Sequence, residues 1–207
     1  MKPTPLDTPA LDDPTVRAKT GQTASQWFAH LDGIGGPTKG RRELVQHLYS
    51  ENKLDEWWST TLVVEYERAR GALEKDGKPK GYSICSTKTV AAPLARVFAA
   101  FGDARDLDRW LGPRTRVAFE DGGKLENADG DRATFVRIRA GKDLRLAWER
   151  AELAPGSQTE VLFADKGKGK TGITLNHTRI QSRAGADLLR AGWSAAFDKL
   201  KALLESA

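Results

Sequence analysis

The stretch GITLNHTRIQSRAGADLLRAGWSAAFDKLKALL, residues Gly172–Leu204, decides the fold. Its first part alternates apolar and polar residues, which predicts a strand, and a short turn separates this strand from one long helix. The helix carries an apolar stripe at three- and four-residue spacing, formed by Leu189, Trp193, Ala196, Leu200 and Leu203. An apolar stripe of this length must be buried, so we expect the helix to lie across the concave side of a sheet.

The same helix mixes very small side chains with very large ones. Gly192, Ala195 and Ala196 lie in sequence beside Trp193 and Phe197. Two explanations stay open at this point: the small residues let the large ones pack closely, or they leave space for a guest molecule beneath the helix. Residues on a helix face can fill a cavity as easily as they can frame one.

The composition is typical of a globular chain. Of 207 residues, 39% are hydrophobic and 29% are charged, which is enough for a packed core and a charged surface. No apolar run approaches the roughly 18 residues that a membrane-spanning helix needs, and the opening MKPTPLDTPALDDP lacks the apolar segment of a signal peptide. The single cysteine, Cys85, excludes an intrachain disulfide. We therefore expect a cytoplasmic protein that does not insert into membranes.

The net charge of +5 is spread along the chain and does not indicate a nucleic-acid-binding protein. Basic and acidic residues balance over residues 1–80, and the excess of basic residues over 81–207 is interleaved with acids. Nucleic-acid-binding surfaces concentrate their basic residues on one stripe. We expect no nucleic-acid partner.

The first part of the chain predicts a small all-α bundle. Residues 1–11 are rich in Pro and Thr and predict a flexible tail. Residues 12–77 contain segments with helical spacing, and Thr23-Ala24-Ser25-Gln26 is a capping box that starts one of these helices. Gly, Pro and alternating charges in EKDGKPKGY, residues Glu74–Tyr82, predict a linker. The second domain is therefore assigned residues 78–207.

The second domain changes to a period of two from Ser83 onward. After a first strand, Pro93 opens a pair of short helices that ends at Gly112-Pro113. Five or six strands follow, separated by hairpin signals such as Asp121-Gly122-Gly123 and Pro155-Gly156. Consecutive strands joined by hairpins form an antiparallel sheet. The predicted fold class is α+β: an antiparallel sheet wrapped on a long C-terminal helix, preceded by a small all-α bundle.

This order of elements carries a family resemblance. With LARVFAAFGDARDLDRWLGP after the first strand and GKTGITLNHTRI and RAGWSAAFDKLKALLE at the end, the chain from Tyr82 to Ser206 resembles the START-like (SRPBCC, helix-grip) superfamily. Within it, the chain is similar to the bacterial branch of homologues of activators of the heat-shock chaperone ATPase. The stretches VRAKTGQTASQWFAHLDG and LDEWWSTTLVVEYERARG resemble a small helical domain of unknown function that is often fused to START-like modules.

The resemblance implies a hydrophobic pocket for a lipid-like or aromatic small molecule. Many relatives only bind a ligand, and some catalyse cyclisation or hydrolysis with polar residues inside the pocket. The co-chaperone activators carry a large N-terminal chaperone-binding domain of a different kind. This chain has a short helical bundle there, which argues against activation of a chaperone ATPase.

The candidate ligand-binding residues are the inward-facing residues of this domain. Each of them can line a cavity or fill the core, and both interpretations stay open. His177 shares the face of Ile173 and Leu175, so it is also a weak candidate for an acid/base residue, although no carboxylate is visible to orient it. Arg137 and Arg145 are expected on the outer face of the sheet. The candidates are Trp110, Phe119, Phe135, Trp148, Phe163, His177, Trp193 and Phe197.

Signatures of other chemistry are absent from the sequence. It has no phosphate-binding glycine loop, no dinucleotide fingerprint and no serine nucleophile elbow, so we expect no cofactor. His30 and His47 lack a Cys or carboxylate at ligand spacing, so surface or capping histidines are expected and no metal site is predicted. The lysines of DKGKGKTG lie at a hairpin tip, and Cys85 is expected as a buried, inert thiol.

Three functions therefore stay open. The leading hypothesis is a non-enzymatic protein that holds a small hydrophobic ligand between sheet and helix, with a stress-related role as one option. The alternatives are a cyclase- or hydrolase-type enzyme that uses His177 as acid/base, and a protein-interaction module that docks a partner through the helical domain. An exposed apolar patch near Trp57 or Trp58 would favour the interaction module.

Overall fold

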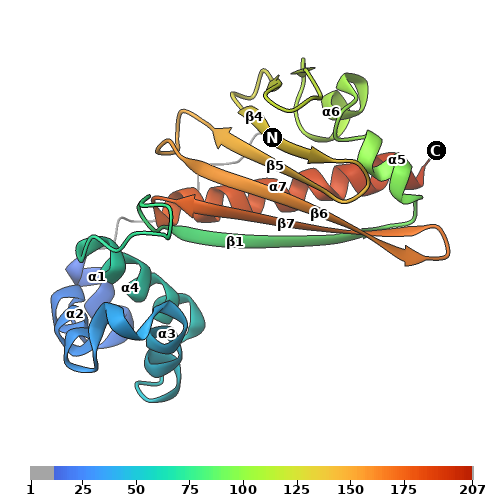
Figure 1. Cartoon of the computed structure of the whole chain (residues 1–207). Helices are drawn as coiled ribbons and strands as arrows, with labels where there is room; N and C mark the ends of the chain where they lie inside the picture. The colour runs from blue at the N-terminus through green and yellow to red at the C-terminus, as the bar shows by residue number, and fades with distance from the viewer. Residues whose placement is uncertain (1–11, 207) are drawn as a thin grey trace. The chain divides into compact units, whose positions relative to one another are not determined.

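The computed structural model describes residues 12–206 and shows two compact units, which divide between Tyr82 and Ser83 (Figure 1). Each unit is described by itself. We call them the helical unit and the sheet–helix unit. The helical unit contains α1 (Asp13–Thr20), α2 (Ala24–Gly33), the 3-10 helix η1 (Gly36–Lys39), α3 (Arg41–Ser50) and α4 (Glu56–Ala69).

Side-chain caps fix where two helices of this unit begin. The predicted capping box is confirmed, because the Thr23 side chain accepts from the Gln26 backbone N–H while the Gln26 side chain accepts from the Thr23 backbone. The Asp55 side chain caps α4 by accepting from the Trp58 backbone N–H at 2.8 Å. The helices enclose a buried apolar core formed by Val16, Trp27, Leu31, Leu44, Leu48, Trp58, Leu62, Val63 and Tyr66.

A polar cluster joins the end of α4 to the last turn of α2. The Tyr66 hydroxyl donates to Asp32 at 2.5 Å, and the Arg70 guanidinium pairs with the same carboxylate. The hydrogen bond from Arg70, followed by that from Tyr66, lowers the pKa of Asp32 to about 2. Burial and the bond to Asp32 raise the pKa of Tyr66 to about 12. Both groups therefore keep their charge state throughout the physiological range.

The segment that composition predicts to be a linker packs back onto the helical unit. Leu73 forms a β-bridge with Pro79. The buried carboxylate of Glu67 accepts from Lys80 at 2.8 Å and from Arg41 at 2.5 Å, and Arg41 also donates to the Gly81 carbonyl at 2.7 Å. Because burying Glu67 requires these cations, the chain stays attached to α4 as far as Gly81.

The sheet–helix unit is built on a seven-stranded sheet in the order β1-β7-β6-β5-β4-β3-β2, with β2 to β7 paired antiparallel. This confirms the predicted α+β fold, in which the sheet wraps on the C-terminal helix. The strands are β1 (Tyr82–Val90), β2 (Arg116–Val117), β3 (Lys124–Glu126), β4 (Arg132–Arg139), β5 (Asp143–Glu149), β6 (Ser157–Gly167) and β7 (Lys170–Ile180). The helices are α5 (Leu94–Ala99), α6 (Ala104–Trp110) and α7 (Arg183–Glu205).

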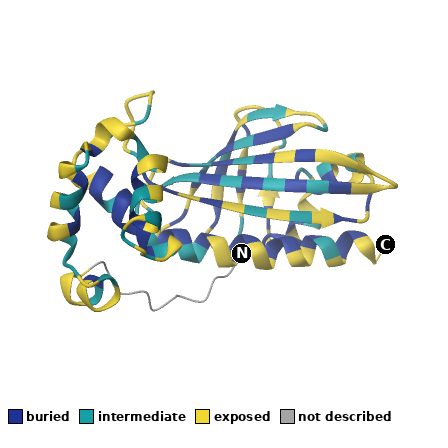
Figure 2. Ribbon diagram, turned by 90° about the horizontal axis from the view of Figure 1, so that it is seen from below, coloured by how far each residue is buried: buried dark blue, intermediate teal, exposed yellow. Residues whose placement is uncertain are grey.

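Helix α7 lies along one face of the sheet, with its buried residues recurring on one side (Figure 2). Ser182 caps it by accepting from the Gly185 backbone N–H at 3.1 Å. All five residues of the predicted stripe are buried, and so are Gly192 and Phe197. Ala195, in contrast, is exposed. The small residues that face the sheet are therefore Gly192 and Ala196. No helix within residues 12–206 is long and apolar enough to cross a membrane.

Truncating the α7 stripe should destabilise the chain. Leu200 is completely buried, so Leu200→Ala should lower the free energy of unfolding by about 2–5 kcal/mol through lost burial and a residual cavity. The neighbouring Lys199 is exposed, and Lys199→Ala should change it by less than about 0.5 kcal/mol. Denaturant unfolding of both variants checks this, and equal effects would contradict the assigned helix orientation.

Candidate functional site

A chain of hydrogen bonds crosses the interior from α7 to three neighbouring strands. The Trp193 indole N–H donates to His177 Nδ1 at 3.2 Å. His177 Nε2 lies 3.0 Å from Ser157 Oγ, and the Ser157 hydroxyl donates to the Trp148 carbonyl at 2.9 Å. These contacts join α7, β7, β6 and β5 at one point in the core.

The partners of His177 determine which ring nitrogen carries the proton. Nδ1 must accept, because the Trp193 N–H can only donate. Ser157 uses its own proton on the Trp148 carbonyl, so its oxygen accepts from His177 Nε2–H. The imidazole is therefore neutral, and since its side chain is fully buried, desolvation lowers its pKa to about 3. Both ring nitrogens are occupied, which leaves neither free for acid/base chemistry at neutral pH.

A small buried cavity lies between the inner face of the sheet and α6 and α7. Its volume is about 20 Å³, far below the several hundred Å³ of typical ligand pockets. His177 does not line it. The lining is almost entirely apolar and consists of Phe101, Leu107, Trp110, Leu111, Leu125, Phe135, Leu144, Leu146, Trp148, Thr159, Val161 and Trp193.

Within residues 12–206, two polar groups of this lining have no hydrogen-bond partner. They are Trp148 Nε1 and Thr159 Oγ1, and both are buried. Trp148 on β5 is paired with Ser157, two residues before Thr159 on β6, so the two side chains are diagonal neighbours on the inner face. A buried, unpaired polar group costs about 1–3 kcal/mol. An occupant that accepts from the Trp148 N–H and bonds the Thr159 hydroxyl would remove this cost.

Residues 91–205 of the chain match the family model described as activator of Hsp90 ATPase homolog 1-like protein. The chain belongs to this family. We refer to it below as the activator-homolog family. Comparison with curated proteins found no match to the sequence.

Solved structures share this fold at low sequence identity. CalU16 from Micromonospora echinospora superposes with a TM-score of 0.55 and 21% identity, over 64% of this chain and 69% of that one. PFC0360w, an HSP90 activator from Plasmodium falciparum, superposes with a TM-score of 0.54 and 22% identity, over 60% of this chain and 96% of that one. The Aha1 dimer from Colwellia psychrerythraea superposes with a TM-score of 0.52 and 16% identity, also over 60% of this chain and 96% of that one. These likenesses establish the fold of the activator-homolog domain and leave its function open.

The structure brings half of the candidate residues to the cavity of this activator-homolog domain. Trp110, Phe135, Trp148 and Trp193 line it. Sequence reasoning missed Thr159, which follows Ser157 and precedes Val161 and Phe163 at a period of two. That alternation could have revealed an inward-facing hydroxyl.

The other four candidates are outside the cavity lining. Phe119 is half-buried, packs on the Phe135 ring at 5.3 Å and lies directly over Gly102. Phe163 is buried against Phe101, with ring centroids 5.1 Å apart. His177 belongs to the hydrogen-bond chain. Phe197 packs at tilted angles against the rings of Trp110 and Trp193 and borders a separate open groove beside β1. The large rings therefore mainly fill the core.

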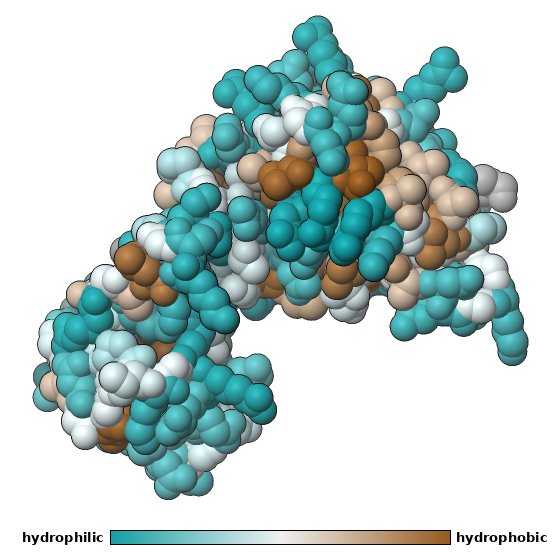
Figure 3. Space-filling model, in the orientation of Figure 1, coloured by the Kyte–Doolittle hydropathy of each residue, from teal (hydrophilic) through white to brown (hydrophobic). Residues whose placement is uncertain are grey.

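The outer face of the sheet carries an arginine–carboxylate network. Arg137 donates to the buried carboxylate of Asp143 at 3.0 Å, and Arg145 pairs with Glu160 at 2.9 Å. The pKa of Asp143 is lowered, chiefly by its hydrogen bond with Arg139. Figure 3 shows hydrophobic residues beside hydrophilic ones on this unit. Val136 and Leu162 are large apolar residues exposed on this face, with 51% and 38% of their surfaces accessible.

Cys85 differs from its prediction as a buried thiol. Its side chain is exposed on β1. The reason is the alternation of the strand: Ile84 takes the buried position, so its neighbour points to solvent.

The buried, neutral His177 should make the stability of this domain pH-dependent. Its folded-state pKa of about 3 lies below its ordinary value of 6.5, so between these values the unfolded chain binds more protons. The free energy of unfolding should therefore fall as pH falls below 6.5, with His177 contributing up to about 1.4 kcal/mol per pH unit.

Urea unfolding between pH 7 and pH 4 checks this contribution. In His177→Gln, which keeps a donor but cannot titrate, the slope with pH should be shallower by that amount. Identical slopes in the two proteins would show that His177 is not held neutral.

Proposed function

We propose that the sheet–helix unit binds a small, mostly apolar molecule that carries one hydrogen-bond acceptor, without chemical conversion. The observation that supports this is the pair of unpartnered polar groups, Trp148 Nε1 and Thr159 Oγ1, in an otherwise apolar, aromatic-rich lining. Binding sites for small molecules are mostly apolar with a few placed polar groups. The engaged state of His177 supports binding over catalysis.

The polar pair restricts the chemical class of the ligand. An indole N–H can only donate, so the ligand atom beside Trp148 must accept, as a ketone, ether, hydroxyl or carboxylate oxygen does. The Thr159 hydroxyl can donate to the same atom or accept from a ligand hydroxyl. Aromatic walls at Phe101, Trp110 and Trp193 suit an aromatic or aliphatic body.

A ligand larger than water needs more room than the closed core provides. A volume of about 20 Å³ accommodates roughly one water molecule. Ladder hydrogen bonds hold β4, β5 and β6 in place, whereas α6 lies outside the sheet. The Trp110 indole donates to the Ala100 carbonyl at 3.0 Å, so this ring is attached to the α5–α6 segment. We infer that outward movement of α6 would carry Trp110 with it and open the cavity.

Binding of prodan, a naphthalene ketone whose emission shifts to the blue in apolar surroundings, tests this proposal. We expect saturable binding of one prodan per chain. Thr159→Val should weaken it about tenfold, because one hydrogen bond of about 1.4 kcal/mol is lost.

Thr174→Val is the matched control, because Thr174 is only half-buried and does not line the cavity. It should leave prodan affinity unchanged. Absence of saturable binding, or equal weakening in both variants, would contradict binding at this cavity.

A second candidate function is protein docking on the outer face of the sheet. The closed core favours it, as do the exposed Val136 and Leu162 beside the arginine network. One structural neighbour is described as an HSP90 activator. Docking through the helical unit was expected to show an exposed apolar patch near Trp57 or Trp58. Trp58 is buried and Trp57 is partly buried, so these two side chains do not form such a patch.

Charge placed on this face should separate docking from ligand binding. If the face contacts an Hsp90-type chaperone, Val136→Glu should weaken co-sedimentation with that chaperone at least tenfold, since a charged side chain would replace an apolar one in the contact and lose its hydration there. The same variant should bind prodan normally. Co-sedimentation that is absent in the unsubstituted chain, or unaffected by Val136→Glu, would contradict docking there.

A further inference from the structure

Two histidines from different helices of the helical unit meet through their ring nitrogens. His30 is on α2 and His47 is on α3, and their Nε2 atoms are 3.2 Å apart. The ring centroids are 5.3 Å apart and the ring planes are inclined by 31°. Both side chains are half-buried. The sequence predicts separate surface or capping histidines, so this pairing is visible only in the fold.

The separation of the two nitrogens matches a metal-binding geometry. Imidazole nitrogens bind zinc at about 2.0–2.1 Å, and two ligands of a tetrahedral ion are then about 3.3 Å apart. We propose that His30 and His47 form a site for a divalent transition-metal ion of the zinc class, which binds Nε2 of both rings. This site is independent of the function proposed for the sheet–helix unit.

Packing holds the His30 ring and the two helices in position before an ion arrives. The His30 ring meets the buried Trp27 ring edge-on at 5.7 Å. Leu31 and Leu48, which directly follow the two histidines in sequence, are completely buried in the core of the unit. The two helices are therefore fixed on either side of the site, and ion binding requires little further ordering.

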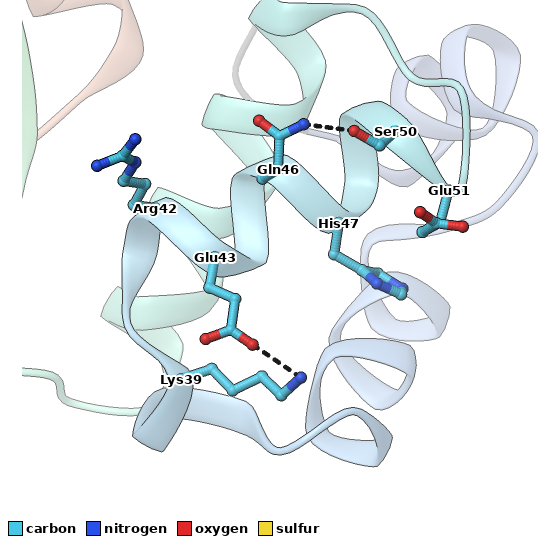
Figure 4. A pocket seen from close by; sticks show the side chains of 7 residues that line it. All are labelled: Lys39, Arg42, Glu43, Gln46, His47, Ser50 and Glu51. Atoms are coloured by element: carbon cyan, nitrogen blue, oxygen red, sulfur yellow. Dashed lines mark hydrogen bonds and ion pairs between the residues drawn. The ribbon is translucent and has the colours of Figure 1, made fainter.

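An exposed carboxylate, that of Glu51, follows His47 by one helical turn. His47 and Glu51 border the same open depression on α3 and are one helical turn apart, which puts them on one helix face (Figure 4). Glu43, one turn before His47, is engaged by Lys39 at 2.9 Å. The Glu51 carboxylate makes no ion pair or hydrogen bond within the part of the chain that the structure describes. Within residues 12–206 no third ligand is already in place beside the two rings, so the Glu51 side chain must turn towards them before it can bind the same ion. Arg42 lines the same depression as Glu51.

The site is exchangeable in character rather than a structural metal centre. Within residues 12–206, no group of three or more His, Cys, Asp or Glu residues is placed to hold a metal ion. Two preformed nitrogens, one carboxylate that must rotate inward and water give an open coordination sphere. Bound metal would link α2 to α3 and stabilise the folded helical unit by mass action.

Zinc titration calorimetry on the metal-free full chain at pH 7.5 tests the site. We expect one Zn²⁺ per chain. His30→Gln and His47→Gln should each weaken binding at least tenfold, and Glu51→Gln by a smaller factor of about three. The third histidine, His177, is completely buried. Cys85 is exposed and is the competing ligand, so Cys85→Ser is the control and should leave the affinity unchanged. Absence of binding, or binding unaffected by the histidine variants, would overturn the proposal.

A second readout needs no substitution and so does not depend on variant folding. Cu²⁺ bound to the unsubstituted chain should show electron paramagnetic resonance splittings from two imidazole nitrogens. Splittings from one nitrogen or none would overturn the site. In either case, His30 and His47 would be a pair of side chains that only hydrogen-bond to each other.

Discussion

The imidazole of His177 is the point on which the packing of the sheet–helix unit depends. Through Trp193 it bonds the long helix, and through Ser157 it bonds the backbone of β5, so one neutral ring joins α7 to three strands. Every polar atom in this chain of bonds has a partner, which is the condition for burying it without a large cost. The indole of Trp193 also packs on the indole of Trp148, with ring centroids 4.9 Å apart, so the hydrogen-bond chain positions the first ring of the aromatic core.

On the other side of these indoles, some buried polar groups lack hydrogen-bond partners within the described part of the chain. Aromatic rings fill most of the space between sheet and α7, and the volume that stays open is about 20 Å³. The two unpaired polar atoms of Trp148 and Thr159 lie in that lining. A purely structural core would lower its free energy by placing apolar groups there, because buried polar groups without partners are destabilising. The presence of these two groups in the core therefore supports the proposed binding of a small molecule by this domain.

Local pattern was sufficient to predict most of the fold. The spacing of Leu189, Trp193 and Leu200 predicted the buried side of α7, and the period of two through Ile173 and Leu175 placed His177 inside. What lay beyond the sequence was tertiary geometry. Whether eight inward side chains leave a cavity depends on how their rings pack together, which explains why Phe163 and Phe197 fill space rather than line it. The meeting of His30 with His47 depends on how α2 and α3 pack, and neither residue carries a local signal of the other.

The most direct test of the central claim is the electron density inside the cavity in a high-resolution crystal structure of the chain as purified. We predict an atom within about 3.2 Å of both Trp148 Nε1 and Thr159 Oγ1, contributed by water or by a ligand retained from the cell. An empty cavity in which both groups instead bond to protein atoms would contradict an acceptor site in the core. It would leave the sheet–helix unit as a closed scaffold, with its outer face as the remaining functional surface.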